Sequence, residues 1–298
     1  MRRLAEDGVT GTPHILSKQM TRRNLLVGAG LAAAGMSVYS GEFARHAIQH
    51  VELPVAVRNL PEAFHGFRIV QISDIHFEEY SEAFYLDSIV RQVNALAADL
   101  VLITGDFITH GPPRHVPEEA IYVIADALRG ITCPQRVGCM GNHDSVVGTD
   151  FIARILRDRG TPVLINQYLP IERDGQRIWI AGVEDPATSR PDLAAAMPTN
   201  PDAPVILLAH APDYADDVRK HPDGGKVDLM LSGHSHGGQI RVPLWGPLVL
   251  PAWGQKYVHG HFQFESLQLY VNRGLGTVGV PFRFDCPPEI TTITLHPA

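Results

Sequence analysis

The sequence predicts an α/β fold in which two mixed β-sheets pack face to face between layers of helices. Two observations support this prediction. Between residues 67 and 160, short apolar runs alternate with segments of helical periodicity, as expected for βαβ units that build a parallel sheet. After residue 160 strand-like segments dominate, so a second sheet is expected there. Residues 51–298 are therefore predicted to form one α/β catalytic domain.

The first half of this domain contains three predicted strand–helix pairs. The strands are expected at 67–76, 99–107 and 136–144, and the helices at 81–98, 117–130 and 149–160. Pro117 and the acids after it are typical of a helix start, and Gly130 is typical of a helix end. Thr149 is predicted to cap the third helix.

The second half is read mainly as strands. Two strands are expected around the Asp174–Gly175 turn, within residues 168–185. A strand followed by a helix is expected in 203–218. Further strands are expected within 226–236, 267–276 and 288–297.

Residues 1–50 are predicted to lie outside this fold, as a leader. Arg22 and Arg23 precede about fifteen small or apolar residues, the layout of an export signal. The segment from Thr21 to Leu26 resembles the twin-arginine signal read by the twin-arginine export machinery. The apolar run is short for a spanning helix, which needs about 20 residues, and no cleavage site is evident. Export with cleavage and a retained membrane anchor both stay open, as do Met1 and Met20 as the start. Either places the domain in the cell envelope, at the outer face of the cytoplasmic membrane.

Composition narrows the class of protein. The net charge is −7, and no Lys/Arg block accompanies interleaved aromatics, so nucleic-acid binding is not expected. The three cysteines are Cys133, Cys139 and Cys286. On one strand the first two would lie roughly 20 Å apart, too far for a disulfide. All three are predicted to be core residues.

Five apolar runs each end in polar residues that bind metals well. The sequence letters are S-D-I-H, G-D, G-N-H-D, L-A-H and G-H-S-H, which contain Asp74, His76, Asp106, Asn142, His143, His210, His234 and His236. In open α/β sheets, ligand sites lie beyond the carboxyl ends of the strands. Carboxylate, amide and imidazole donors suit Mn, Fe or Zn. Each motif alone is weak, but the ordered set predicts that all five strand ends converge on one metal site.

This ordered set resembles the calcineurin-like metallophosphoesterase superfamily over residues 67–240, which implies a four-layer sandwich. The sequences SGHSHGGQIRVP and LYVNRGLGTVGVPFRFDCPPEITTITL resemble a bacterial branch of envelope phosphodiesterases, several of which carry twin-arginine signals. The resemblance implies a metal-dependent phosphodiesterase in which a metal-bound hydroxide attacks phosphorus. One alternative is a pyrophosphatase that cleaves a lipid-linked substrate such as UDP-2,3-diacylglucosamine. This alternative favours an uncleaved anchor and a cytoplasmic or interfacial active site. The other is an envelope protein that binds metal without catalysis, against which the complete set of donors argues.

The resemblance also implies a role for each donor, with two divalent ions (Mn, Fe or Zn) as cofactors. The first ion has Asp74, His76 and His236 as ligands, the second has Asn142, His210 and His234, and Asp106 bridges both. Of the two imidazoles of G-H-S-H, one thereby binds each of the two neighbouring ions. Gly233 and Gly237 are expected to leave room for that turn.

By the same resemblance, His143 either donates a proton to the leaving oxygen or stabilises the transition state. In the protein serine/threonine phosphatase branch, an acid three residues after the G-D aspartate orients this histidine. Thr109 stands at that place here, so either Asp144 substitutes for the acid or His143 is held less rigidly. Phosphate oxygens also need donors, and Arg241 is the first candidate for substrate binding, followed by two arginines of the C-terminal segment, Arg273 and Arg283.

Overall fold

The computed structural model describes residues 21–77, 82–110, 119–265 and 267–298. The chain divides into two units between Val38 and Tyr39. The described part of the first unit is the helix α1 (Arg22–Val38), which contains the arginine pair. Among the described helices, none combines the length and the hydropathy needed to cross a membrane. The two candidate start residues and the predicted helix start at Pro117 lie outside the described residues.

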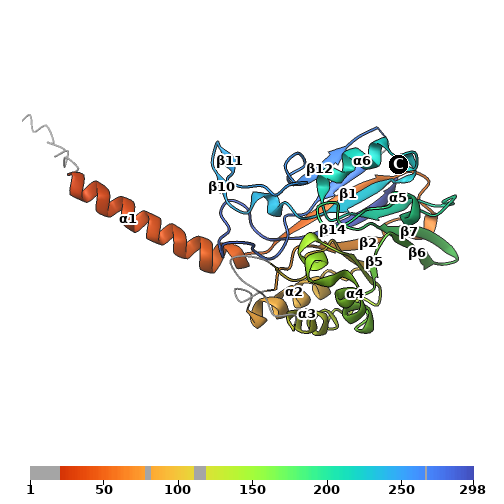
Figure 1. Ribbon diagram of the computed structural model, residues 1–298, viewed down its shortest axis with the longest axis horizontal. Helices are drawn as coiled ribbons and strands as arrows, with labels where there is room; N and C mark the ends of the chain where they lie inside the picture. The colour runs from red at the N-terminus through yellow and green to blue at the C-terminus, as the bar shows by residue number, and fades with distance from the viewer. Residues whose placement is uncertain (1–20, 78–81, 111–118, 266) are drawn as a thin grey trace, which may run out of the picture. The chain divides into compact units, whose positions relative to one another are not determined.

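The second unit, Tyr39–Ala298, is built on two six-stranded sheets (Figure 1). The first sheet has the order β1 (Gln49–Val57), β14 (Glu289–Pro297), β2 (Arg68–Ile72), β3 (Leu100–Ile103), β4 (Arg136–Cys139) and β5 (Val163–Leu164). The strands from β2 to β5 are parallel, and β14 runs antiparallel to β2 and parallel to β1. The sheet is therefore mixed, as predicted.

The second sheet is mixed as well. Its order is β12 (Gly260–Gln263), β13 (Gln268–Val271), β9 (Leu229–Ser232), β8 (Val205–Leu208), β7 (Gln176–Gly182) and β6 (Gln167–Arg173). The four strands β13, β9, β8 and β7 are parallel, and the two edge strands are antiparallel to their neighbours. Both sheets thus present a block of parallel strands whose carboxyl ends lie at one edge.

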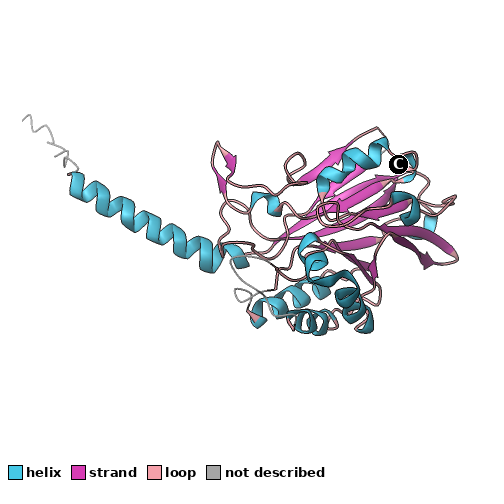
Figure 2. Cartoon of the chain, viewed as in Figure 1, coloured by secondary structure: helices cyan, strands magenta, loops and turns pink. Residues whose placement is uncertain are grey.

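Helices cover the outer face of each sheet (Figure 2). The helices α2 (Ala83–Ala95), α3 (Ala120–Leu128) and α4 (Asn142–Asp158) share an apolar core with the first sheet. The short helices α5 (Leu193–Ala196) and α6 (Ala215–Lys220) share another with the second sheet. A third core, which includes Ile69, Leu102, Ile206 and Leu231, fills the space between the sheets. The four-layer sandwich is therefore confirmed, and the three cysteines are buried and unpaired as predicted.

The start of α4 differs from the prediction. Thr149 was expected to cap this helix, but the helix begins at Asn142 and has a kink at Gly148, where φ is 142°. The reason is the buried carboxylate of Asp144, which accepts a hydrogen bond from the backbone N–H of Gly141 at 3.0 Å. This contact fixes the first turn directly after β4, so the helix starts at the candidate site.

Several further elements were not predicted, among them the short strand β5 and the short helix α5. Strand β1 starts at Gln49, within the segment assigned to the leader, and residues from Tyr39 onward already belong to the second unit. Strand β12 and a two-stranded hairpin, β10 (Arg241–Val242) and β11 (Gly246–Pro247), were also not expected. The hairpin strands are too short for a periodicity to register.

Candidate metal centre

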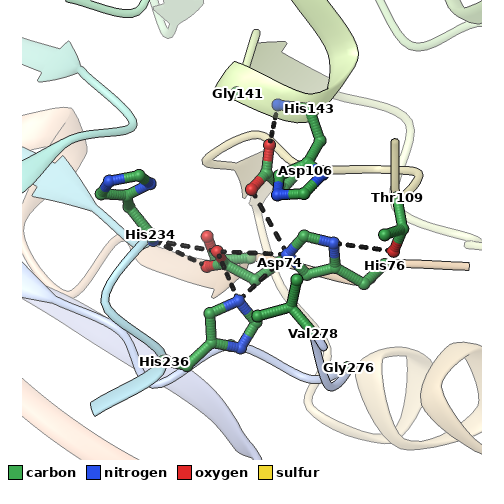
Figure 3. A network of polar contacts seen from close by, with 12 residues as sticks. Asp74, His76, Asp106, Thr109, Gly141, His143, His234, His236, Gly276 and Val278 are labelled. Carbon is green, nitrogen blue, oxygen red and sulfur yellow. Dashed lines mark hydrogen bonds and ion pairs between the residues drawn. The ribbon is translucent and has the colours of Figure 1, made fainter. Parts of the chain in front are cut away.

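The strand ends of both sheets meet at one place (Figure 3). Asp74 and His76 follow β2, and Asp106 follows β3. Asn142 and His143 form the first turn of α4. The second sheet contributes His210 after β8 and the pair His234 and His236 after β9. Six of these eight residues line one cavity of about 400 Å³, namely His76, Asp106, Asn142, His143, His234 and His236.

The carboxylate of Asp106 lies at the centre of this group. Its Oδ2 atom is 3.3 Å from His76 Nε2 and 3.1 Å from His210 Nε2. Its Oδ1 atom accepts a hydrogen bond of 3.0 Å from the backbone N–H of His143. Asp106 thus faces a histidine from each sheet and the first turn of α4 at the same time.

Donor atoms gather on both sides of Asp106. On one side, His236 Nε2 lies 3.4 Å from Asp74 Oδ1 and 3.0 Å from His76 Nε2. On the other side, His234 Nδ1 lies 3.1 Å from His210 Nε2. The structure therefore brings together three groups, in each of which the donor atoms lie within 4.8 Å of one another: Asp74, His76 and His236; His76, Asp106 and His143; and Asp106, His210 and His234.

The outward-facing ring nitrogens of these histidines are held by neighbours. His210 Nδ1 lies 2.7 Å from the carbonyl oxygen of Thr104, and His234 Nε2 lies 2.7 Å from that of Ala252. A carbonyl only accepts, so these nitrogens carry protons. His76 Nδ1 lies 3.0 Å from the Thr109 hydroxyl. Metal-binding histidines are typically oriented in this way, with the other nitrogen turned to the ion.

Burial and mutual contact shift the protonation of the group. Burial acts to raise the pKa of Asp106, but the adjacent His210 and His76 hold that pKa well below its usual range. Burial acts to lower the pKa of His210, but Asp106 raises it well above its usual range. Burial raises the pKa of Asp74 to about 6 and lowers that of His76 to about 4. Without a cation, His210 is therefore a protonated partner of Asp106, and a cation must displace that proton to bind there.

The donor set fits divalent cations. Asn142 Oδ1 is buried and has no hydrogen-bond partner among the described residues, although buried polar atoms are normally paired. Asn142 is the neutral oxygen donor expected beside His210 and His234. A cation on each side of Asp106 would satisfy this oxygen and would take the place of the proton on His210.

The backbone at these donors is strained. Five of them have a positive φ between 45° and 69°, namely Asp74, His76, Asp106, His234 and His236. A positive φ is uncommon outside glycine, and such residues concentrate at functional sites. Gly233 sits at the end of β9, where a Cβ atom would lie 1.9 Å from Ser73 Oγ and 2.1 Å from Asp74 Oδ2. The prediction that Gly233 makes room for the histidine turn is thereby confirmed.

His143 is held differently from the expectation. The carboxylate of Asp144 does not orient it, because that carboxylate accepts hydrogen bonds from the backbone N–H groups of Gly141, Phe107 and Ile108. His143 Nδ1 instead accepts a hydrogen bond of 2.9 Å from the backbone N–H of His110. A neutral His143 therefore carries its proton on Nε2, in a side chain that lines the cavity.

The three arginines considered for substrate binding lie elsewhere. Arg241 donates to the carbonyl oxygen of Gly237 at 2.8 Å and is not among the residues that line the cavity. Arg273 pairs with the buried carboxylate of Glu289. Arg283 is completely buried and donates to several carbonyl oxygens and, from Nη2 at 3.5 Å, to His236 Nδ1. Arg283 therefore supports the turn that carries His236 and does not face a phosphate.

Comparison with known proteins gives a consistent result. Residues 67–238 match the calcineurin-like phosphoesterase family. The uncharacterized metallophosphoesterase YkuE of Bacillus subtilis is 35% identical, over 93% of this chain and 98% of its own length. The phosphodiesterase YaeI of Escherichia coli is 30% identical, over 77% and 82% of the two chains. The UDP-2,3-diacylglucosamine pyrophosphatase LpxG of Chlamydia trachomatis is 26% identical, over 78% and 85%.

The close approach at Gly233 yields a stability prediction. Gly233→Ala is expected to destabilise the fold by about 1–3 kcal/mol, because the added methyl group overlaps Ser73 and Asp74. Gly225→Ala is the matched control, since nothing lies within 4 Å of a Cβ atom there. Thermal unfolding of both variants measures the difference. Equal melting temperatures would contradict the packing described here.

Proposed function

Because the chain belongs to the calcineurin-like phosphoesterase family, we propose that its donor cluster holds two divalent metal ions and hydrolyses a phosphodiester. That the chain is a metal-dependent phosphoester hydrolase follows from the family and its relatives. The number of ions and the kind of ester are the proposal. The observation that carries it is the position of Asp106, whose single Oδ2 atom faces a histidine from each of two donor groups.

In this proposal each residue has one task. Asp74, His76 and His236 hold one ion, Asn142, His210 and His234 hold the other, and Asp106 is shared. When bound, two such metal ions neutralise the charge on the phosphoryl oxygens and supply a nucleophile from water at neutral pH. Mn, Fe and Zn all suit this mixture of oxygen and nitrogen donors.

His143 is proposed as the general acid. Its Nδ1 atom accepts a hydrogen bond from the backbone N–H of His110, so Nε2 is the atom that can face a leaving oxygen. Proton donation by Nε2 requires the imidazolium form, in which Nδ1 is also protonated and gives up its contact with the His110 N–H. The backbone N–H of His143 in the first turn of α4 already donates to Asp106 Oδ1, so the departing oxygen is stabilised by the His143 side chain.

A lipid-linked pyrophosphate is the second candidate substrate. One observation favours it: the wall of the cavity opposite the donors is apolar and includes Ile240, Leu248 and Val278. A relative over most of the chain, LpxG, is named for the hydrolysis of UDP-2,3-diacylglucosamine. Assays with bis-p-nitrophenyl phosphate, p-nitrophenyl phosphate and a UDP-lipid, with Mn, Fe, Zn and Mg in parallel, separate the two candidates and the monoester.

We also propose that the domain acts in the cell envelope, exported or anchored at the outer face of the cytoplasmic membrane. The support is the arginine pair at the start of α1, followed by the apolar side chains of that helix. The partner in this step is the twin-arginine export machinery.

The shared carboxylate provides the test of the two-ion site. Asp106→Asn keeps the shape but removes the charge that both ions share, so most of the metal and at least about 100-fold in rate should be lost. Asp174→Asn, in the exposed turn between β6 and β7, is the control. Metal content by mass spectrometry and the hydrolysis of bis-p-nitrophenyl phosphate are measured. Full metal content with near-normal turnover would rule out the shared ligand.

The role of His143 is tested by the leaving group. A general acid contributes about 10²–10⁴-fold, and a poor leaving group depends on it most. His143→Ala should keep its metal and slow an alkyl phosphodiester far more than an aryl one. His234→Ala, by contrast, should lose metal and slow both esters together. If His143→Ala is depleted in metal, His143 is a ligand; if both esters slow equally, it is not the general acid.

The export proposal has its own test. Replacing Arg22 and Arg23 together by Lys should block translocation and leave the domain folded and active, because the pair serves as an address. Cell fractionation and the specific activity of the retained protein are the measurements. Undiminished export of the double variant argues against the twin-arginine route.

A further inference from the structure

The cavity at the donor cluster has two chemically different halves. One half consists of the carboxylate, amide and imidazole groups described above. The other half is formed by Ile240, Leu248, Val249, Pro251, Val278 and Val280. Charged groups are absent from this second wall, so it offers no partner to a sugar or to a second phosphate. Its chemistry suits a hydrocarbon chain.

The apolar wall continues outward into an exposed segment. Residues 242–251 read VPLWGPLVLP, ten consecutive residues without a polar side chain. Leu248 is 61% exposed, Val249 78% and Val280 43%. At the tip of the hairpin, Leu244 and Trp245 are almost fully exposed. Elsewhere in the described part of the domain, exposed apolar side chains occur singly or in twos, such as Tyr122 with Val123. Residues 242–251 alone supply four, and Leu248 and Val249 line the same cavity as Val280.

The hairpin holds this surface in a defined shape. Strand β10 pairs with β11 through Arg241 with Pro247 and Val242 with Gly246. The turn between them has Leu244 in a left-handed conformation, with φ at 69°, where glycine or asparagine would be usual. The hairpin projects away from both sheets (Figure 1). A bulky side chain in a strained turn that points into solvent indicates that the tip has a function beyond folding.

The surface is also fixed to the donor cluster. The segment follows His236 by only a few residues, and Gly238 is packed so closely that a Cβ atom there would lie 2.3 Å from Pro247 Cβ. The buried Gln239 side chain accepts a hydrogen bond from the backbone N–H of Val278 and donates to the carbonyl oxygen of Val280. Gln239 thereby ties the two apolar sides of the cavity together. A molecule on the apolar wall therefore has a fixed position relative to the donors.

We propose that residues 242–251, together with Val278 and Val280, dock onto a lipid bilayer and that the substrate is an amphiphilic phosphate ester drawn from it. The inference rests on the proposed function, because it places the phosphate at the donor cluster and the acyl chain along the apolar wall. A lipid surface fits better than a protein partner because the segment has no charged or polar group with which to specify one. Tryptophan is also the side chain that favours the membrane interface.

Fluorescence of Trp245 tests the docking independently of catalysis. The full-length protein is mixed with phosphatidylcholine vesicles that contain bromine-labelled acyl chains, and the emission of Trp245→Phe is subtracted to isolate Trp245. Bromine is expected to quench the Trp245 emission. Helix α1 has no tryptophan, so its own binding to vesicles cannot produce this signal. If the bromine-labelled lipid leaves the Trp245 emission unchanged, the proposal is overturned. It is also overturned if the protein self-associates through this surface and does not bind the vesicles.

A second measurement tests the link to catalysis. The rate on a phosphodiester embedded in vesicles is divided by the rate on bis-p-nitrophenyl phosphate in water. Leu244→Ser should lower this ratio about tenfold or more, because one apolar side chain no longer leaves water on docking. Val123→Ser, an exposed apolar residue on α3, should leave the ratio unchanged. If Trp245 is quenched but the protein has no diesterase activity, the docking surface is supported and the proposed function is rejected. An unchanged ratio for Leu244→Ser overturns the proposed delivery of substrate.

Discussion

The carboxylate of Asp106 is the contact on which the arrangement of the whole site depends. It lies after β3 in the first sheet, yet one of its oxygens faces His210 from the second sheet and the other accepts a hydrogen bond from the first turn of α4. The two sheets are also joined by apolar packing, which is non-directional, and by further buried hydrogen bonds such as that from Gln71 Nε2 to the carbonyl oxygen of Ser232. A buried charge is tolerated only when it is paired and hydrogen-bonded, so Asp106 fixes the register between the layers in a way that the apolar core cannot.

The remaining donors show why this arrangement requires cations. Imidazoles in contact, a carboxylate whose pKa is raised by burial and an unpartnered amide oxygen would each be costly in a protein without metal. Left-handed backbone at five donors adds to that cost. A site of this kind is pre-organised for its ions, because the fold has already offset the free energy needed to bring the ligands together.

Much of the fold and the donor set was predictable from the sequence, because strand ends carry their chemistry in residue type. The apolar run before S-D-I-H indicates both a buried strand and the position of Asp74 and His76. Contacts made by the backbone left no such signal: the carbonyl groups of Thr104 and Ala252 and the N–H of His110 depend on conformation alone. The expected role of Asp144 failed for the same reason, since its partners are backbone N–H groups. Arg283 was misjudged because a cation is normally exposed, whereas here carbonyl oxygens surround it.

The position of β14 has a consequence for how the domain is made. This strand follows all the other described strands in sequence, yet it lies inside the first sheet, between β1 and β2, and pairs with β1 along nine residues. During synthesis, the sheet that carries Asp74 and Asp106 therefore has an open gap until the residues of β14 have left the ribosome. Closure of that gap joins residues far apart in sequence, which is the slow kind of folding step. A chain that is truncated before β14 therefore cannot complete the sheet that carries the site, because β1 would have no strand to pair with.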